Sequence, residues 1–137
     1  MGRVAVEAVL DEFHSAAAAA DEQRYFATLS ADMVFLGTAP GERWEGRVWR
    51  DVVHGYFSRG KGWTYEPSER SVTVSDDGLT AWFDETVENV SYGRCRGSGV
   101  LRREGDSWRI VQYNLTIPLP DALAPEVVAK IGEMRPA

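Results

Sequence analysis

The segment Thr80–Glu88 alternates aromatic, acidic and hydroxyl side chains at the two-residue period of a β-strand. Its two faces carry Trp82, Asp84 and Thr86 on one side and Phe83, Glu85 and Val87 on the other. A carboxylate buried beside aromatic rings has a raised pKa and can act as a general base. Asp84, which shares its face with Trp82, is the candidate catalytic residue if that face is the inner one. The alternative is an inert, hydrogen-bonded carboxylate at a pocket rim.

Aromatic side chains also flank a helix predicted near the middle of the chain. Trp44 precedes this helix, and Trp63 and Tyr65 follow it at the start of a strand. Rings in such positions either stack on a flat ligand at the mouth of a cavity or close off a core. Together with the strand residues Trp82 and Tyr113 they form the predicted ligand-binding set. Tyr113 is also a candidate acid or hydrogen-bond donor.

Nothing in the sequence predicts a metal or a cofactor. The two histidines, His14 and His54, lack the spacing of metal ligands. The segment Cys95–Gly99 contains two glycines, but it lacks the Lys-Ser or Lys-Thr pair and the helix that a phosphate-binding loop requires. Its glycines favour a curved strand instead, and its lone cysteine is typical of a small buried apolar residue. We expect no cofactor and no metal.

The composition indicates one globular domain spanning residues 1–137, with 44% hydrophobic and 26% charged residues. The net charge of −6 disfavours nucleic acid and anionic membrane surfaces as partners. The single cysteine cannot form an internal disulfide, and the acidic N-terminal segment lacks the apolar run of a signal peptide. These features predict a cytoplasmic protein that binds neither nucleic acid nor membranes.

Hydrophobic periodicity predicts helices in the first part of the chain and strands in the second. Helices are expected over residues 6–20, after a cap at Asp21, from Trp49 to Phe57, and from Pro125 to Met134. Strands are expected at Met33–Leu36, Trp63–Ser75, Leu79–Val90, Arg94–Glu104 and Trp108–Ile117. Helices followed by an antiparallel meander indicate an α+β fold.

The chain resembles the nuclear transport factor 2-like superfamily, in its SnoaL-like and ketosteroid-isomerase-like branch. The resemblance rests on the order of the elements, on WEG (44–46) before the third helix and on WRIVQYNLT (108–116) in the last strand. It implies a cone-shaped roll in which N-terminal helices pack on a curved antiparallel sheet, with Asp84 and its face inside the cone. Members of the superfamily include isomerases, cyclases, dehydratases, epoxide hydrolases and non-catalytic assembly domains, and they usually dimerise.

The last strand has two alternative registers. A strict two-residue turn before it would place Gln112 and Asn114 on the inner face. Apolarity and the resemblance instead favour Val111, Tyr113 and Leu115 on that face, which requires a bulge or a longer loop. We adopt the second register.

The resemblance allows one activity to be compared residue by residue. Ketosteroid isomerases use a tyrosine on the first helix, an aspartate base after the first strand and a second acid on a late strand. The matching positions in this chain are Phe13, Gly37 and Gly99, whose side chains neither donate nor accept a proton. We expect no isomerase activity of this type, and whether the chain is an enzyme stays open.

Three functions are compatible with these patterns. The first, which we favour, is a pocket protein that binds a small apolar or polyketide-like molecule. The second is a hydrolase or dehydratase that uses Asp84 as its base. The third is a non-catalytic dimer whose cone is filled by its own side chains.

A homodimer is expected through the outer face of the sheet. The residues predicted there mix apolar and polar types, whereas a solvated face is more uniformly charged. They are Phe83, Glu85, Val87, Arg96, Ser98, Val100, Gln112 and Asn114.

Overall fold

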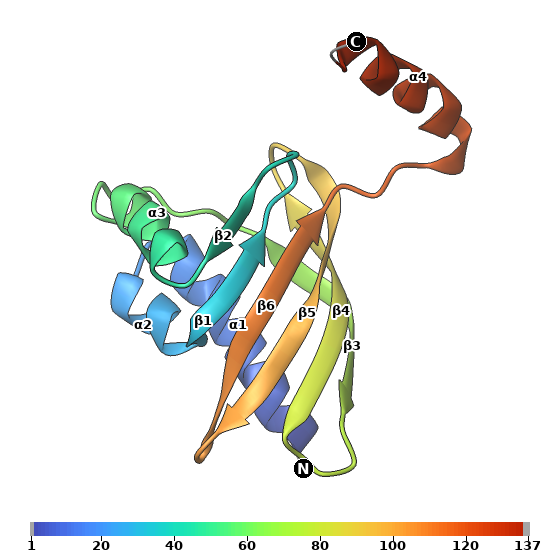
Figure 1. The fold of residues 1–137 in the computed structure, drawn as a ribbon. Coiled ribbons are helices and arrows are strands. Elements are labelled where there is room, and N and C mark those ends of the chain that lie inside the picture. The colour runs from blue at the N-terminus through green and yellow to red at the C-terminus, as the bar shows by residue number, and fades with distance from the viewer. Residues whose placement is uncertain (1, 136–137) are drawn as a thin grey trace.

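Helices cover one face of a curved six-stranded sheet in the computed structural model, which describes residues 2–135 (Figure 1). The helices are α1 (Gly2–Ala18), α2 (Glu22–Ala27), α3 (Arg47–Phe57) and α4 (Ala124–Met134), with a short 3-10 helix η1 (Asp121–Leu123). The strands are β1 (Leu29–Leu36), β2 (Arg43–Glu45), β3 (Glu66–Val74), β4 (Thr80–Asn89), β5 (Gly93–Glu104) and β6 (Ser107–Thr116). Within residues 2–135, no helix combines the length and apolar character needed to cross a membrane.

The helices α1 and α3 bury the apolar stripes that the sequence predicts. The buried stripe residues are Val6, Leu10 and Phe13 in α1 and Trp49, Val53 and Phe57 in α3. The side chain of Asp21 accepts a hydrogen bond from the Arg24 N–H at 3.2 Å, which confirms the predicted cap of α2. The predicted C-terminal helix is present as α4, which extends away from the sheet and buries none of its residues (Figure 1).

The strand order is β2-β1-β6-β5-β4-β3, and β3 to β6 form the predicted antiparallel meander. β1 differs because it lies parallel to β6. The Ile110 N–H of β6 donates to the Thr28 carbonyl, just before β1, at 2.8 Å and joins the start of β1 to β6. The α+β class, with N-terminal helices on a curved sheet, is confirmed, but the sheet is mixed instead of wholly antiparallel.

A bulge at Val111 sets the register of β6. The pairing with β5 passes from Ile110 directly to Gln112 and leaves Val111 without a partner. Tyr113 and Leu115 therefore face the interior and are buried, while Gln112 is exposed. The bulged register is confirmed, although Val111 itself is only partly buried.

The predicted orientation of β4 is wrong. Phe83, Glu85 and Val87 are buried on the inner face, at 4%, 2% and 0% exposure. Trp82 and Asp84 are exposed on the outer face. Three members of the predicted outer set therefore belong to the core, and the candidate base lies on the side of the sheet opposite the helices.

The turn between β4 and β5 explains this error. The Asn89 side chain accepts hydrogen bonds from the N–H groups of Ser91 and Tyr92, both at 2.9 Å, and closes a turn of three residues. A two-residue turn would pair Asp84 with a buried residue of β5. The longer turn pairs it with Ser98 on the outer face, and every side chain of β4 changes face with it.

Candidate functional site

The interior of the cone holds a buried polar cluster centred on Glu85. His14 Nε2–H donates to Glu85 Oε2 at 2.6 Å, and the Tyr113 hydroxyl donates to the same oxygen at 2.9 Å. Arg70 Nε–H donates to Glu85 Oε1 at 2.7 Å. Three side chains, from α1, β3 and β6, thus meet at one carboxylate of β4, and both of its oxygens have partners.

A bulge in β3 brings Arg70 to this cluster. The pairing of β3 with β4 gains one residue between Ser68 and Ser71, and Glu69 has a φ of 47°. The Arg70 side chain turns towards α1, where Nη1–H donates to Asp11 Oδ1 at 2.8 Å. The cluster therefore joins the helix layer to the sheet by ionic hydrogen bonds.

The electrostatics of the cluster keep Glu85 ionised at neutral pH. Burial alone would raise its pKa, but the hydrogen bond from His14 and the charges of His14 and Arg70 outweigh burial, so the pKa of Glu85 lies below its usual value. Burial, together with the Glu85 charge, raises the pKa of Tyr113 well above that of a free tyrosine. At neutral pH, Tyr113 is therefore a neutral hydroxyl that donates a hydrogen bond to the ionised Glu85 carboxylate.

Gly97 makes room for this arrangement. It pairs with Leu115 on the inner face of the sheet, and a Cβ at Gly97 would overlap the Tyr113 hydroxyl. The sequence predicts that the glycines of β5 favour a curved strand. Gly97 has a second role, because the absence of a side chain lets the Tyr113 hydroxyl lie close to its backbone.

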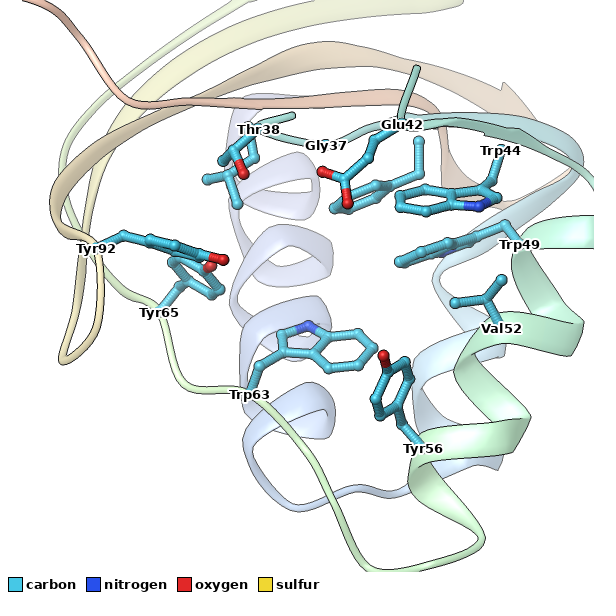
Figure 2. A pocket seen from close by; sticks show the side chains of 12 residues that line it. Gly37, Thr38, Glu42, Trp44, Trp49, Val52, Tyr56, Trp63, Tyr65 and Tyr92 are labelled. Carbon is cyan, nitrogen blue, oxygen red and sulfur yellow. The ribbon is translucent and has the colours of Figure 1, made fainter. Parts of the chain in front are cut away.

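A pocket of about 250 Å³ lies at the open end of the cone, next to α3 (Figure 2). Seven of its twelve lining residues are aromatic, namely Phe35, Trp44, Trp49, Tyr56, Trp63, Tyr65 and Tyr92. The remaining lining residues are Gly37, Thr38, Glu42, Val52 and Leu115. The structure thus brings together the predicted residues Trp44, Trp63 and Tyr65.

Short-range packing fixes the rings of this pocket. Trp44 on β2 pairs with Phe35 on β1, and the Phe35 ring stacks on Trp49 of α3 with centroids 4.1 Å apart. The Trp63 N–H donates to the Ala17 carbonyl at the end of α1, at 3.2 Å. A Cβ at the preceding residue, Gly62, would overlap that carbonyl oxygen, so only glycine lets Trp63 approach α1 so closely.

The other predicted site residues lie elsewhere. Trp82 is 48% exposed on the outer face of the sheet, so its predicted place inside the cone is wrong. Asp84 faces the same way and contacts neither the pocket nor the Glu85 cluster. Tyr113 lies one layer below the pocket floor, where it lines a cavity of only about 20 Å³ with Phe13, His14, Phe35, Trp63, Tyr65 and Leu115.

Sequence reasoning missed several residues of both sites. Trp49 and Tyr56 belong to the apolar stripe of α3 and are absent from the predicted ligand-binding set, yet both line the pocket. Glu42 and Tyr92 lie in turns, where periodicity carries no signal. Glu85 was detectable, because Ala81, Phe83 and Val87 make its face of β4 the more apolar one.

The three positions that were compared with ketosteroid isomerases lie in different parts of the structure and do not form one site. Phe13 is buried in the core, Gly37 lines the pocket, and Gly99 faces the backbone of β6. Among residues 2–135, no three His, Cys, Asp or Glu side chains converge as a metal site would require.

Several solved structures have folds similar to that of this chain. An NTF2-like protein of unknown function from Pseudomonas putida KT2440 has a TM-score of 0.70 and 14% identity, over 85% of this chain and 86% of that one. An NTF2-like protein from Streptomyces avermitilis, proposed to be a dehydratase, has a TM-score of 0.70 and 16% identity, over 85% and 95%. A proposed scytalone dehydratase from Novosphingobium aromaticivorans has a TM-score of 0.70 and 12% identity, over 85% and 84%.

These likenesses show that the chain has the NTF2-like fold. Residues 6–120 match the model of the SnoaL-like domain, and the chain therefore belongs to the SnoaL-like family. A search of curated proteins found no match.

Proposed function

We propose that this protein binds a small, flat, largely apolar molecule in the aromatic pocket. The observation that carries the proposal is the convergence of seven aromatic side chains on one open cavity (Figure 2). Aromatic rings provide large contact areas with little loss of side-chain entropy, and ligand pockets are typically apolar with a few polar groups. Burial, with smaller effects of neighbouring groups in the same direction, raises the pKa of Tyr65 to about 12, so its hydroxyl stays available as a donor.

The pocket volume limits the part of the ligand that is enclosed. Pockets for drug-sized ligands span roughly 300–1,000 Å³. At about 250 Å³ this pocket accommodates one or two rings, and the rest of a larger polyketide-like molecule would extend past the half-exposed Tyr56 and Tyr92. The cavity below the pocket measures only about 20 Å³, so the ligand would occupy the mouth of the cone.

A second candidate function is acid–base catalysis of the hydrolase or dehydratase type. Asp84 is not suited to it because it lies on the opposite side of the sheet. The favouring observation is the small cavity below the pocket, which reaches His14 and is large enough for one water molecule. His14 is held by Glu85, and a histidine oriented by a carboxylate is suited to proton transfer.

A ligand screen tests both functions. We expect planar aromatic compounds to raise the melting temperature, because a ligand that binds only the folded state stabilises it. Each compound that binds is then incubated with the protein and analysed by mass spectrometry. Unchanged compounds support a binding protein, and conversion that His14→Gln abolishes would support catalysis. If no planar compound shifts the melting temperature at millimolar concentration, the binding proposal is wrong.

We also propose that two copies associate through the outer face of the sheet. Among residues 2–135 no helix covers this face (Figure 1), and Trp82 on β4 is 48% exposed there. Asp84 and Arg96 have no ion-pair partner among residues 2–135, and they lie on adjacent strands of this face. A two-fold axis between two copies can place the carboxylate of each opposite the guanidinium of the other.

Sedimentation equilibrium tests this assembly. We expect a dimer at micromolar concentration, and Trp82→Asp should shift it to a monomer because it replaces an exposed apolar ring of the proposed interface by a charge. Val4→Asp is the matched control, since Val4 is 74% exposed on α1, away from the sheet. A wild-type protein that sediments as a monomer at these concentrations would contradict the proposal.

A further inference from the structure

The aromatic pocket carries a single fixed charge, and that charge is negative. Among residues 2–135, twelve line the cavity; Glu42 is their only carboxylate, and none of them is Lys, Arg or His. The aromatic faces add to this polarity, because the face of an aromatic ring is the negative end of its quadrupole. The pocket therefore presents negative potential to whatever enters it.

Glu42 is held where a ligand would meet it. The Ala39 N–H donates to Glu42 Oε1 at 2.8 Å, and the Gly37 N–H donates to the Glu42 carbonyl at 2.8 Å. Figure 2 shows the carboxylate directed into the pocket beside Trp44 and Trp49. Among residues 2–135 the Glu42 side chain has no ion-pair partner, because the adjacent Arg43 pairs with Glu45 at 3.1 Å.

The rim already shows the interaction that such a pocket favours. The Arg59 guanidinium lies 5.6 Å from the centroid of the Tyr56 ring, in the geometry of a cation on an aromatic face. A ligand cation inside the pocket would meet several rings together with the Glu42 carboxylate. A neutral ligand would instead remove water from that carboxylate without replacing it by a partner.

We propose that the ligand is an organic cation whose charge is surrounded by apolar groups, such as a quaternary ammonium or a protonated aromatic amine. This proposal rests on the proposed function, since it specifies the ligand class of the same pocket. The rings would contact the apolar groups, and Glu42 would balance the charge. An anionic ligand of equal size is excluded by the same carboxylate.

The test compares two probes of nearly equal shape, phenyltrimethylammonium and its neutral isostere tert-butylbenzene, by quenching of tryptophan fluorescence. We expect the cation to bind at least tenfold more tightly to the wild type. Glu42→Gln keeps the acceptor for the Ala39 N–H and removes the charge, so it should abolish most of this preference while changing the affinity for tert-butylbenzene less than twofold. Asp51→Asn removes an exposed charge on α3 that does not line the pocket and has no ion-pair partner among residues 2–135, so it should leave the preference unchanged.

The outcomes separate the two proposals. Equal affinities for the two probes, or a preference that survives in Glu42→Gln, would overturn the cation inference and leave a neutral aromatic ligand in the pocket. No binding of either probe at saturating concentration would overturn the cation inference too, and the planar compounds of the screen then decide whether the pocket binds any ligand.

Discussion

Glu85→Gln is expected to lower the free energy of unfolding by about 3 kcal/mol, because it leaves Arg70 buried without its main charged partner. Glu85 is 2% exposed and accepts hydrogen bonds from three side chains, which an amide cannot all satisfy. In a domain of this length the change corresponds to a loss of roughly 10 °C in melting temperature. Chemical denaturation at one fixed protein concentration measures it.

The stabilising effect of Glu85 should also depend on pH in a defined direction. Its pKa is lowered in the folded state, so the unfolded chain binds the proton more readily. The contribution is fully present above the ordinary pKa of a glutamate and is lost as the pH falls through the lower, folded value. The difference in the free energy of unfolding between the wild type and Glu85→Gln should therefore become smaller below about pH 4.

Asp84→Asn is the matched control for this experiment. Asp84 is the neighbouring residue on the same strand but faces outward, so in the Trp82→Asp background, where the proposed dimer contact is absent, its stability change should stay within about 0.5 kcal/mol. If Asp84→Asn were the destabilising variant and Glu85→Gln the neutral one, the orientation of β4 described above would be inverted.

Trp63→Leu is expected to lower the affinity for the strongest ligand of the screen at least tenfold, which corresponds to about 1.4 kcal/mol of binding free energy. The indole of Trp63 forms one side of the pocket opposite Trp49, with ring centroids 6.1 Å apart, and leucine fills part of the space without providing a flat surface. Isothermal titration calorimetry measures the affinity, and circular dichroism verifies that the variant remains folded.

Trp82→Leu provides the comparison within the same chain. It makes the same substitution on the outer face of the sheet, so ligand affinity should change less than twofold. If ligand affinity depended on Trp82 and not on Trp63, the ligand would bind the outer face of the sheet, where we propose the dimer contact. The proposal that the aromatic pocket binds the ligand would then be wrong.

The fold was predictable from the sequence because its signals are local. The apolar stripe of α1, the cap at Asp21 and the alternation in β6 each depend on neighbouring residues. The parallel pairing of β1 with β6 was not predictable in this way, because it joins segments about eighty residues apart. Hydrophobic periodicity indicates which residues face a core, but it does not indicate which strands pair with each other.

The site was predictable only in part, for a related reason. Trp44, Trp63 and Tyr65 were identified because aromatic residues beside turns are conspicuous. The Glu85 cluster depends on the turn closed by Asn89, and one extra residue there reverses the face of β4. His14 meets Glu85 across 71 positions of the sequence, and no local pattern connects them.

The most direct test of ligand binding in the pocket uses the five tryptophan indole groups as reporters in nitrogen–proton correlation spectra. Trp44, Trp49 and Trp63 line the pocket, Trp82 lies on the outer face and Trp108 is buried at the opposite end of the sheet. Titration with the strongest ligand of the screen should shift the indole resonances of the first three and leave the other two in place. Shifts confined to Trp82 or Trp108 would contradict the assignment of the aromatic pocket as the binding site.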